Sequence, residues 1–147
     1  MPRIKLDESD VYRSLYERKL VKSDLNYAGH LGNDSLVTIL QESRIDLFRE
    51  LGFTELDLGD GRTGLIIGDL VINFKSECFE DDVLQVETGI GELKPASMRL
   101  FYRVGRKTDG KLIALAETGV VAFDYGTRKP GSWPDEFLKR LDGTVFK

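Results

Sequence analysis

The residues best suited to chemistry lie between Lys22 and Leu51, around the only histidine of the chain. His30 falls in a polar loop, residues 24–34, with the sequence DLNYAGHLGND. Its glycines and Asx residues favour tight turns. A histidine there can hold a water molecule or polarise a carbonyl group, because an imidazole ring exchanges a proton near neutral pH. The alternative is a histidine that caps or buttresses the loop.

A long helical pattern follows this loop and must position it. From Asn33 or Asp34 as the N-cap, the chain continues to Leu51 without glycine or proline, and its apolar residues recur at helical spacing. Gly52 stands where a C′ glycine ends a helix. The pattern predicts a helix of about five turns.

The start of this helix is suited to binding a developing negative charge. The first N–H groups of a helix have no partner within it, and its dipole is positive at this end. We expect the N–H of His30 or of a neighbour to donate to such an oxyanion. Gly29 would let the backbone approach a substrate without a Cβ atom in the way.

Two charged residues lie further along the predicted helix. Glu42 projects onto the flank of the apolar face and is our candidate general base. The alternative is a solvated glutamate or an ion-pair partner of Arg44 or Arg49. Arg44 projects into the apolar face, so if buried it needs a carboxylate partner.

The rest of the chain alternates apolar and polar residues in a way typical of strands. Asp109 and Gly110 form a hairpin signal between the last two strands, which predicts that they are antiparallel neighbours. A short closing helix is expected after Ser132, its possible N-cap. The predicted strands span residues 11–21, 65–75, 83–93, 98–107 and 112–124. We expect an α+β fold with one long helix on a five-stranded antiparallel sheet.

Composition narrows the range of functions. At 147 residues with 41% hydrophobic residues, the chain is predicted to form a single domain over residues 1–147. No apolar run is long enough to cross a membrane, so we expect an unexported protein without membrane contact. A net charge of −4 argues against nucleic acid as a partner. Cys78 is the only cysteine, so neither an intrachain disulfide nor a zinc site is expected, and the cytoplasm is the natural compartment.

The loop and helix together resemble a known family. The sequence DLNYAGHLGND followed by LQESR is similar to the loop-helix signature of hot-dog-fold acyl-CoA thioesterases of the 4-hydroxybenzoyl-CoA thioesterase type, approximately D-x-D-x-x-G-H-x-x-N followed by E-x-R. The segment VINFKSECFEDD, the hairpin KTDGKLIALAETGVVAFD and the closing RKPGSWPDEF also look like parts of such enzymes. The resemblance covers nearly the whole chain.

The resemblance implies a function and an assembly. It implies hydrolysis of an acyl-CoA or acyl carrier protein thioester without a cofactor, in a homodimer or homotetramer whose active sites lie at the dimer interface. Asp24 is the other candidate base, although we expect it to orient the loop, and Asn33 is expected to tie the loop to the helix; both are also candidate substrate contacts. The resemblance places the phosphates of CoA near Lys94 and Ser97, with the pairs at 106–107 and 128–129 as alternatives.

Position 26 departs from the family signature. The family commonly carries a catalytic carboxylate there, and this chain has Asn26. An amide has no accessible protonation step near neutral pH, so it cannot act as nucleophile or general base. Asn26 can still hydrogen-bond the water or the thioester. The sequence therefore leaves two interpretations: hydrolysis that relies on Glu42 and His30, or a non-catalytic acyl-CoA binding protein of the same fold. A dehydratase of the hot-dog fold is a third interpretation and the least favoured of the three.

Overall fold

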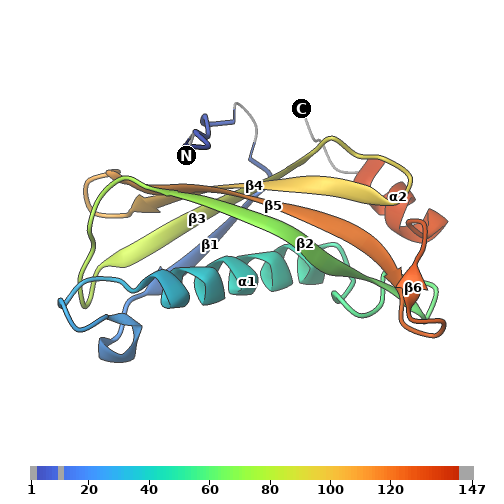
Figure 1. The fold of residues 1–147 in the computed structure, drawn as a ribbon, viewed down its shortest axis with the longest axis horizontal. Helices are drawn as coiled ribbons and strands as arrows, with labels where there is room; N and C mark the ends of the chain where they lie inside the picture. The colour runs from blue at the N-terminus through green and yellow to red at the C-terminus, as the bar shows by residue number, and fades with distance from the viewer. Residues whose placement is uncertain (1–2, 10–11, 143–147) are drawn as a thin grey trace.

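The computed structural model describes residues 3–9 and 12–142 and has two layers, a curved antiparallel sheet and a long helix in its hollow (Figure 1). The elements, in chain order, are β1 (Ser14–Lys19), the 3₁₀ turn η1 (Lys22–Asp24), α1 (Asn33–Glu50), β2 (Thr63–Phe74), β3 (Val83–Gly91), β4 (Ser97–Arg106), β5 (Leu112–Asp124), β6 (Lys129–Pro130) and α2 (Asp135–Asp142). This is the hot-dog fold, and it confirms the predicted α+β class. No helix in the described part of the chain is long and apolar enough to cross a membrane.

The sheet has the strand order β1-β3-β4-β5-β2, and the short β6 pairs with β5. All pairings are antiparallel, and the hairpin at Asp109 and Gly110 joins β4 to β5 as predicted. The prediction of five strands missed β6, because a strand of two residues has no alternation to read. The first strand is shorter than predicted and begins at Ser14, while residue 11 of the prediction lies outside the described residues.

The helix boundaries differ slightly from those predicted. Gly32, with an extended backbone, is the N-cap of α1, so the prediction of Asn33 or Asp34 is wrong. Gly52 follows the helix with φ +90°, which confirms its C′ position. The prediction of Ser132 as the N-cap of the last helix is wrong, because α2 begins at Asp135 and Leu138 N–H donates to the carbonyl of Pro134.

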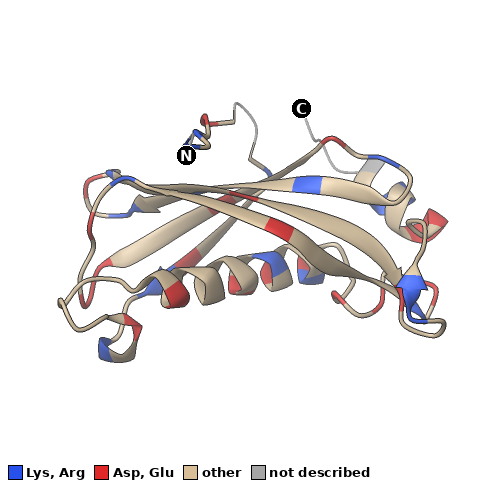
Figure 2. Ribbon diagram, viewed as in Figure 1, with Lys and Arg blue, Asp and Glu red and all other residues tan. Residues whose placement is uncertain are grey.

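The core lies between α1 and the inner face of the sheet. Apolar residues of the helix, among them Leu36, Leu40 and Leu47, are fully or almost fully buried against inner-face residues such as Val86 and Leu100. Figure 2 shows charged residues along α1, at the strand ends and at single positions within the strands. Burying these apolar side chains provides the main free energy of folding.

Arg44 lies in this core with a carboxylate partner, as predicted. Its Nε donates to Glu55 Oε1 at 2.9 Å, and its Nη1 donates to the Tyr102 hydroxyl at 3.4 Å. Tyr102 in turn shares a 2.8 Å hydrogen bond with Thr118. The buried guanidinium is therefore fully embedded in a polar network that links α1 to the sheet.

The inner side of β2 is less well covered than the other strands. Helix α1 packs chiefly over β3 and β1, at the opposite side of the sheet. On β2, Ile67, Leu70 and Phe74 pair with inner-face positions of β5, yet they are 40%, 38% and 47% exposed. An apolar strip therefore runs along the free edge of the sheet.

Candidate active site

The predicted loop is a tight hairpin that ends next to the start of α1. A bridge between Leu25 and Leu31 closes it, and Asn26 N–H donates to the carbonyl of His30 at 2.8 Å. Gly29 turns the chain with φ +84°, a conformation that glycine adopts without strain. No atom lies within 4 Å of the place where a Cβ of Gly29 would stand. The tip is thus open to an approaching ligand.

The side chain of Asn26 organises this hairpin. Its Oδ1 accepts a hydrogen bond from Ala28 N–H at 2.9 Å and a longer one from His30 N–H at 3.4 Å. Its Nδ2 lies 3.4 Å from His30 Nδ1, which is also 3.3 Å from the carbonyl oxygen of Leu31. The ring of His30 is therefore held at Nδ1 and free to use Nε2.

The start of α1 offers N–H groups at the same place. Gly32 N–H donates to the carbonyl of Asp24 at 3.0 Å, and no side chain caps the first turn of the helix. A Cβ at position 32 would stand 2.7 Å from Asp34 Oδ1, the end of a flexible side chain that can turn away. The uncapped N–H groups and the helix dipole form an anion-binding end.

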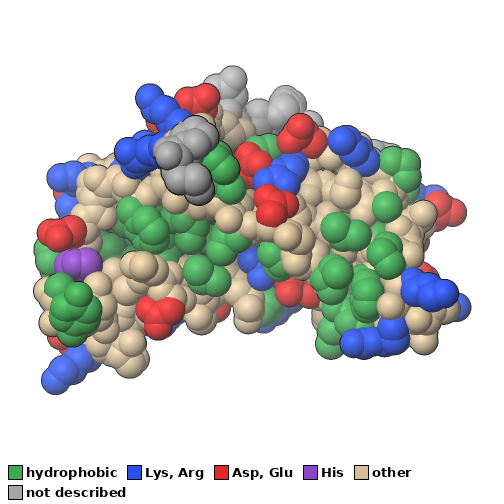
Figure 3. All heavy atoms as spheres, in the orientation of Figure 1, with side chains coloured by type: hydrophobic (Ala, Val, Ile, Leu, Met, Phe, Trp, Pro, Cys, Tyr) green, Lys and Arg blue, Asp and Glu red, His purple; other side chains and the backbone are tan. Residues whose placement is uncertain are grey.

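A cavity of about 300 Å³ lies beside His30. The loop and the helix start contribute one wall, and the end of β2 with the segment after it contributes the other. In Figure 3 the histidine lies near one end of the molecule, beside apolar side chains. The lining residues are His30, Leu31, Asn33, Phe74, Lys75, Ser76, Glu77, Cys78 and Ile113.

Glu77 is the residue of this cavity that sequence reasoning missed. Its Oε1 lies 3.7 Å from His30 Nε2. The sequence signal was weak, since Glu77 is one of several acidic residues after β2 and is far from His30 along the chain. The contact depends on Leu31 N–H, which donates to the carbonyl of Cys78 at 2.9 Å and joins the loop to this segment.

Cys78 also lines the cavity, with its side chain almost fully buried. Burial raises the pKa of the thiol to about 11, and the charge of Asp82 contributes in the same direction. The thiolate is the reactive form of cysteine. Cys78 is therefore an apolar wall residue near neutral pH.

Glu42 lies in a different cavity from His30. It borders a hollow of about 270 Å³ with Tyr16, Ile45, Asp46 and Arg49. Its Oε1 accepts hydrogen bonds from Arg18 Nη1 at 2.7 Å and from the Tyr16 hydroxyl at 3.0 Å. Burial and the bond to Glu42 raise the pKa of Tyr16. Within one chain, the structure does not bring Glu42 and His30 together.

Asp24 faces the interior of the protein and is 7% exposed. Arg18 Nη2 donates to both of its carboxylate oxygens, at 2.9 and 3.1 Å, and Val21 N–H donates to Oδ2 at 2.8 Å. Arg18 thus joins Asp24 of the loop to Glu42 of the helix. This placement supports a loop-orienting role for Asp24.

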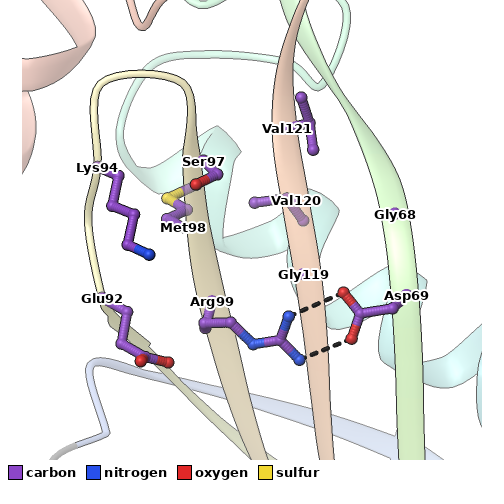
Figure 4. A pocket seen from close by; sticks show the side chains of 10 residues that line it. All are labelled: Gly68, Asp69, Glu92, Lys94, Ser97, Met98, Arg99, Gly119, Val120 and Val121. Atoms are coloured by element: carbon purple, nitrogen blue, oxygen red, sulfur yellow. Dashed lines mark hydrogen bonds and ion pairs between the residues drawn. The ribbon is translucent and has the colours of Figure 1, made fainter.

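Lys94 and Ser97 lie in a third cavity, of about 210 Å³, on the side of the sheet away from α1 (Figure 4). Arg99 dominates it, since its two Nη atoms donate to Asp69 at 2.8 and 2.7 Å and its Nε donates to Glu117 at 2.6 Å. The guanidinium lowers the pKa of Asp69. Its charge is already matched by carboxylates, so of these residues only Lys94 offers an unpaired cation to a phosphate.

Comparison with known proteins agrees with the sequence resemblance. Residues 20–141 match the model of a family described as the thioesterase-like superfamily. The chain belongs to the thioesterase-like superfamily. Its general reaction is therefore hydrolysis of a thioester bond.

Individual relatives of this thioesterase are distant. It is 26% identical to the acyl-CoA thioesterase YbgC of Haemophilus influenzae over 114 residues. These residues cover 77% of this chain and 82% of the relative. Its fold matches a 1,4-dihydroxy-2-naphthoyl-CoA thioesterase from Synechocystis with a TM-score of 0.79 at 19% identity, over 87% of this chain and 94% of the other. It also matches the Staphylococcus aureus protein SAV2348, solved in complex with CoA, with a TM-score of 0.78 at 15% identity, over 92% and 87% of the two chains.

Proposed function

We propose that this thioesterase hydrolyses an acyl-CoA, or the corresponding acyl carrier protein thioester, to the free acid and the thiol in the cytoplasm. The observation that carries the proposal is the cavity beside His30, which combines a histidine, an uncapped helix start and apolar walls. The acyl-CoA substrate of the Haemophilus relative and the CoA bound to the Staphylococcus protein support the substrate class.

In this mechanism the N–H groups at the start of α1 bind the carbonyl oxygen as it becomes an oxyanion. We favour the backbone N–H groups of Asn33 and its neighbour as oxyanion donors, in place of the N–H of His30. The N–H of His30 is directed at Asn26, whereas Asn33 lines the cavity. His30 Nε2 orients the attacking water. Gly29 leaves the loop tip open for the thioester to approach.

Glu42 as general base stays a prediction, as does phosphate binding by Lys94 and Ser97. The ion pair of Glu42 with Arg18, and its separate cavity, favour a positioning role. The cavity that contains Lys94 and Ser97 lies on the face of the sheet opposite α1. This placement favours other residues of the oligomer as the contacts of the CoA phosphates.

We also propose a homodimer, with a homotetramer as the larger alternative. The free edge of β2 exposes Ile67, Leu70 and Phe74, and Phe74 is itself part of the cavity wall. Edge strands with exposed apolar residues pair readily with another strand. Pairing there would enclose the open side of each cavity.

The second candidate function is acyl-CoA binding without turnover, which is favoured by Asn26. A panel of aliphatic and aromatic acyl-CoA substrates, with free thiol as the readout, separates the two. We expect thiol release with at least one substrate. Tight binding of the panel without release, and release restored by Asn26→Asp, would establish the binding protein instead.

A further inference from the structure

The cavity beside His30 contains one carboxylate among its described lining residues, that of Glu77. Water attack on a thioester requires a group that accepts a proton. Asn26 cannot do so as an amide, and Asp24 and Glu42 are both engaged by Arg18 outside this cavity. Glu77 is therefore the carboxylate base that the cavity itself provides, beside the imidazole of His30.

The geometry suits a water molecule between two groups. Glu77 Oε1 and His30 Nε2 are 3.7 Å apart, beyond the range of a direct hydrogen bond. One water molecule can bond to both atoms at ordinary distances of about 2.8 Å. The side chain of Glu77 is 66% exposed, so it can be reached by solvent and by substrate.

The backbone around Glu77 is anchored on both sides. Lys75 N–H donates to the carbonyl of Ile113 at 2.8 Å, and the carbonyl of Cys78 accepts from Leu31 N–H at 2.9 Å. Arg106 Nη1 donates to the carbonyl of Glu77 itself at 3.4 Å. These bonds hold Glu77 against the loop, because one of them comes from the residue next to His30.

We infer that Glu77 is the general base of this thioesterase, an assignment that rests on the proposed function. The oxygen of a water molecule held by Glu77 and His30 forms a bond to the thioester carbon, while a proton of that water passes to the Glu77 carboxylate. The C–S bond then breaks and its electron pair goes to sulfur. Glu77 returns the proton to the thiolate, which yields the free acid and the thiol.

Two other lining residues, Lys75 and Cys78, do not offer a competing route. Lys75 is a cation, and Cys78 is buried with a raised pKa, so an acyl-enzyme on sulfur is disfavoured. Direct attack by water, assisted by Glu77, requires no covalent intermediate.

The test compares Glu77→Gln with Glu80→Gln, a matched control at an exposed glutamate three residues along the same segment. With an acyl-CoA that the wild-type protein hydrolyses, we expect kcat of Glu77→Gln to fall about 100-fold or more with KM changed less than about threefold. Glu80→Gln should keep the wild-type kcat. Glu77→Asp, which keeps a carboxylate, should recover part of the loss.

A second variant distinguishes loss of the carboxylate from a change in structure as the cause of the lower kcat. Adding Asn26→Asp to Glu77→Gln places a carboxylate on the other side of His30, and we expect kcat to rise by about tenfold or more over the single variant. Equal kcat values for Glu77→Gln, Glu80→Gln and wild type would overturn the assignment and leave the proposed function standing. A wild-type protein that releases thiol from no acyl-CoA or acyl carrier protein thioester would overturn both.

Discussion

Asn26 and His30 form a unit at the residue scale. The amide of Asn26 accepts from backbone N–H groups of the loop and also presents its NH₂ group to His30 Nδ1, whereas an ionised carboxylate can only accept. The amide therefore fixes the loop and the ring together. In our proposal the carboxylate comes from another part of the chain, Glu77.

The positions of the site residues differ in how well they can be predicted from the sequence. Asn26, Gly29 and His30 belong to one short turn whose hydrogen bonds connect neighbours, so their arrangement could be predicted. Glu77 could not, because its place beside His30 depends on how β2 ends against β5 and on the link from Leu31 to Cys78. Such contacts between distant segments leave no local pattern.

Cys78 offers a test of the cavity wall that does not depend on activity. With a thiol pKa of about 11, the thiolate is only about one part in a thousand at pH 8, and the side chain is buried as well. We expect iodoacetamide to label native Cys78 at least about 100-fold more slowly than the protein unfolded in guanidinium chloride. Similar rates in the two states would contradict the buried position.

At the scale of elements, Arg18 of β1 holds the loop against the helix. It binds Asp24, next to the hairpin, and Glu42, in the middle of α1. The sequence predicted the strand and the helix from their periodicity and an acidic partner for Arg44. The sequence did not predict that Arg18 is the partner of Glu42. Which of several arginines pairs with Glu42 depends on how β1 packs beside α1 and not on spacing along the helix.

Replacing Arg18 should disturb both stability and catalysis. Arg18→Met leaves the buried Asp24 carboxylate with its backbone bond alone, and we expect a loss of about 1–3 kcal/mol in the free energy of unfolding. We also expect kcat to fall about tenfold or more, because the loop that carries His30 loses its anchor. Urea unfolding and thiol release measure the two effects.

Lys19→Met is the matched control for this variant. Its ammonium makes only an exposed ion pair with Asp81, so the change should cost less than about 0.5 kcal/mol and leave kcat unaltered. Equal effects of the two variants on kcat would contradict the role of Arg18.

At the scale of the whole molecule, residues near the N-terminus lie over the outer face of the sheet, whereas the edge of β2 is open. Residues near the N-terminus lie on the outer face of the sheet (Figure 1), where Asn73 bonds to Leu6 N–H at 2.6 Å and to the carbonyl of Ile4 at 2.9 Å. The edge of β2, in contrast, has no neighbouring strand in the described structure. The fold class followed from the order of elements, but this uneven coverage did not, since it depends on where α1 crosses the sheet.

We expect wild-type protein to be a dimer that pairs along β2. Leu70→Lys places a charge on the exposed apolar strip of that edge and should yield a species of half the mass by size-exclusion chromatography with light scattering. Leu56→Lys, at a 65% exposed turn residue outside β2, should leave the dimer intact. A wild-type monomer, or a Leu70→Lys variant with unchanged mass, would show that the edge is not the interface.

Thioester hydrolysis beside His30 is tested by kcat for thiol release from an acyl-CoA by the His30→Ala variant. We predict a value about 100-fold or more below that of the wild type. Tyr27→Ala, a fully exposed change in the same loop, should stay within about threefold of wild type. A His30→Ala enzyme with wild-type kcat would show that hydrolysis does not depend on this histidine.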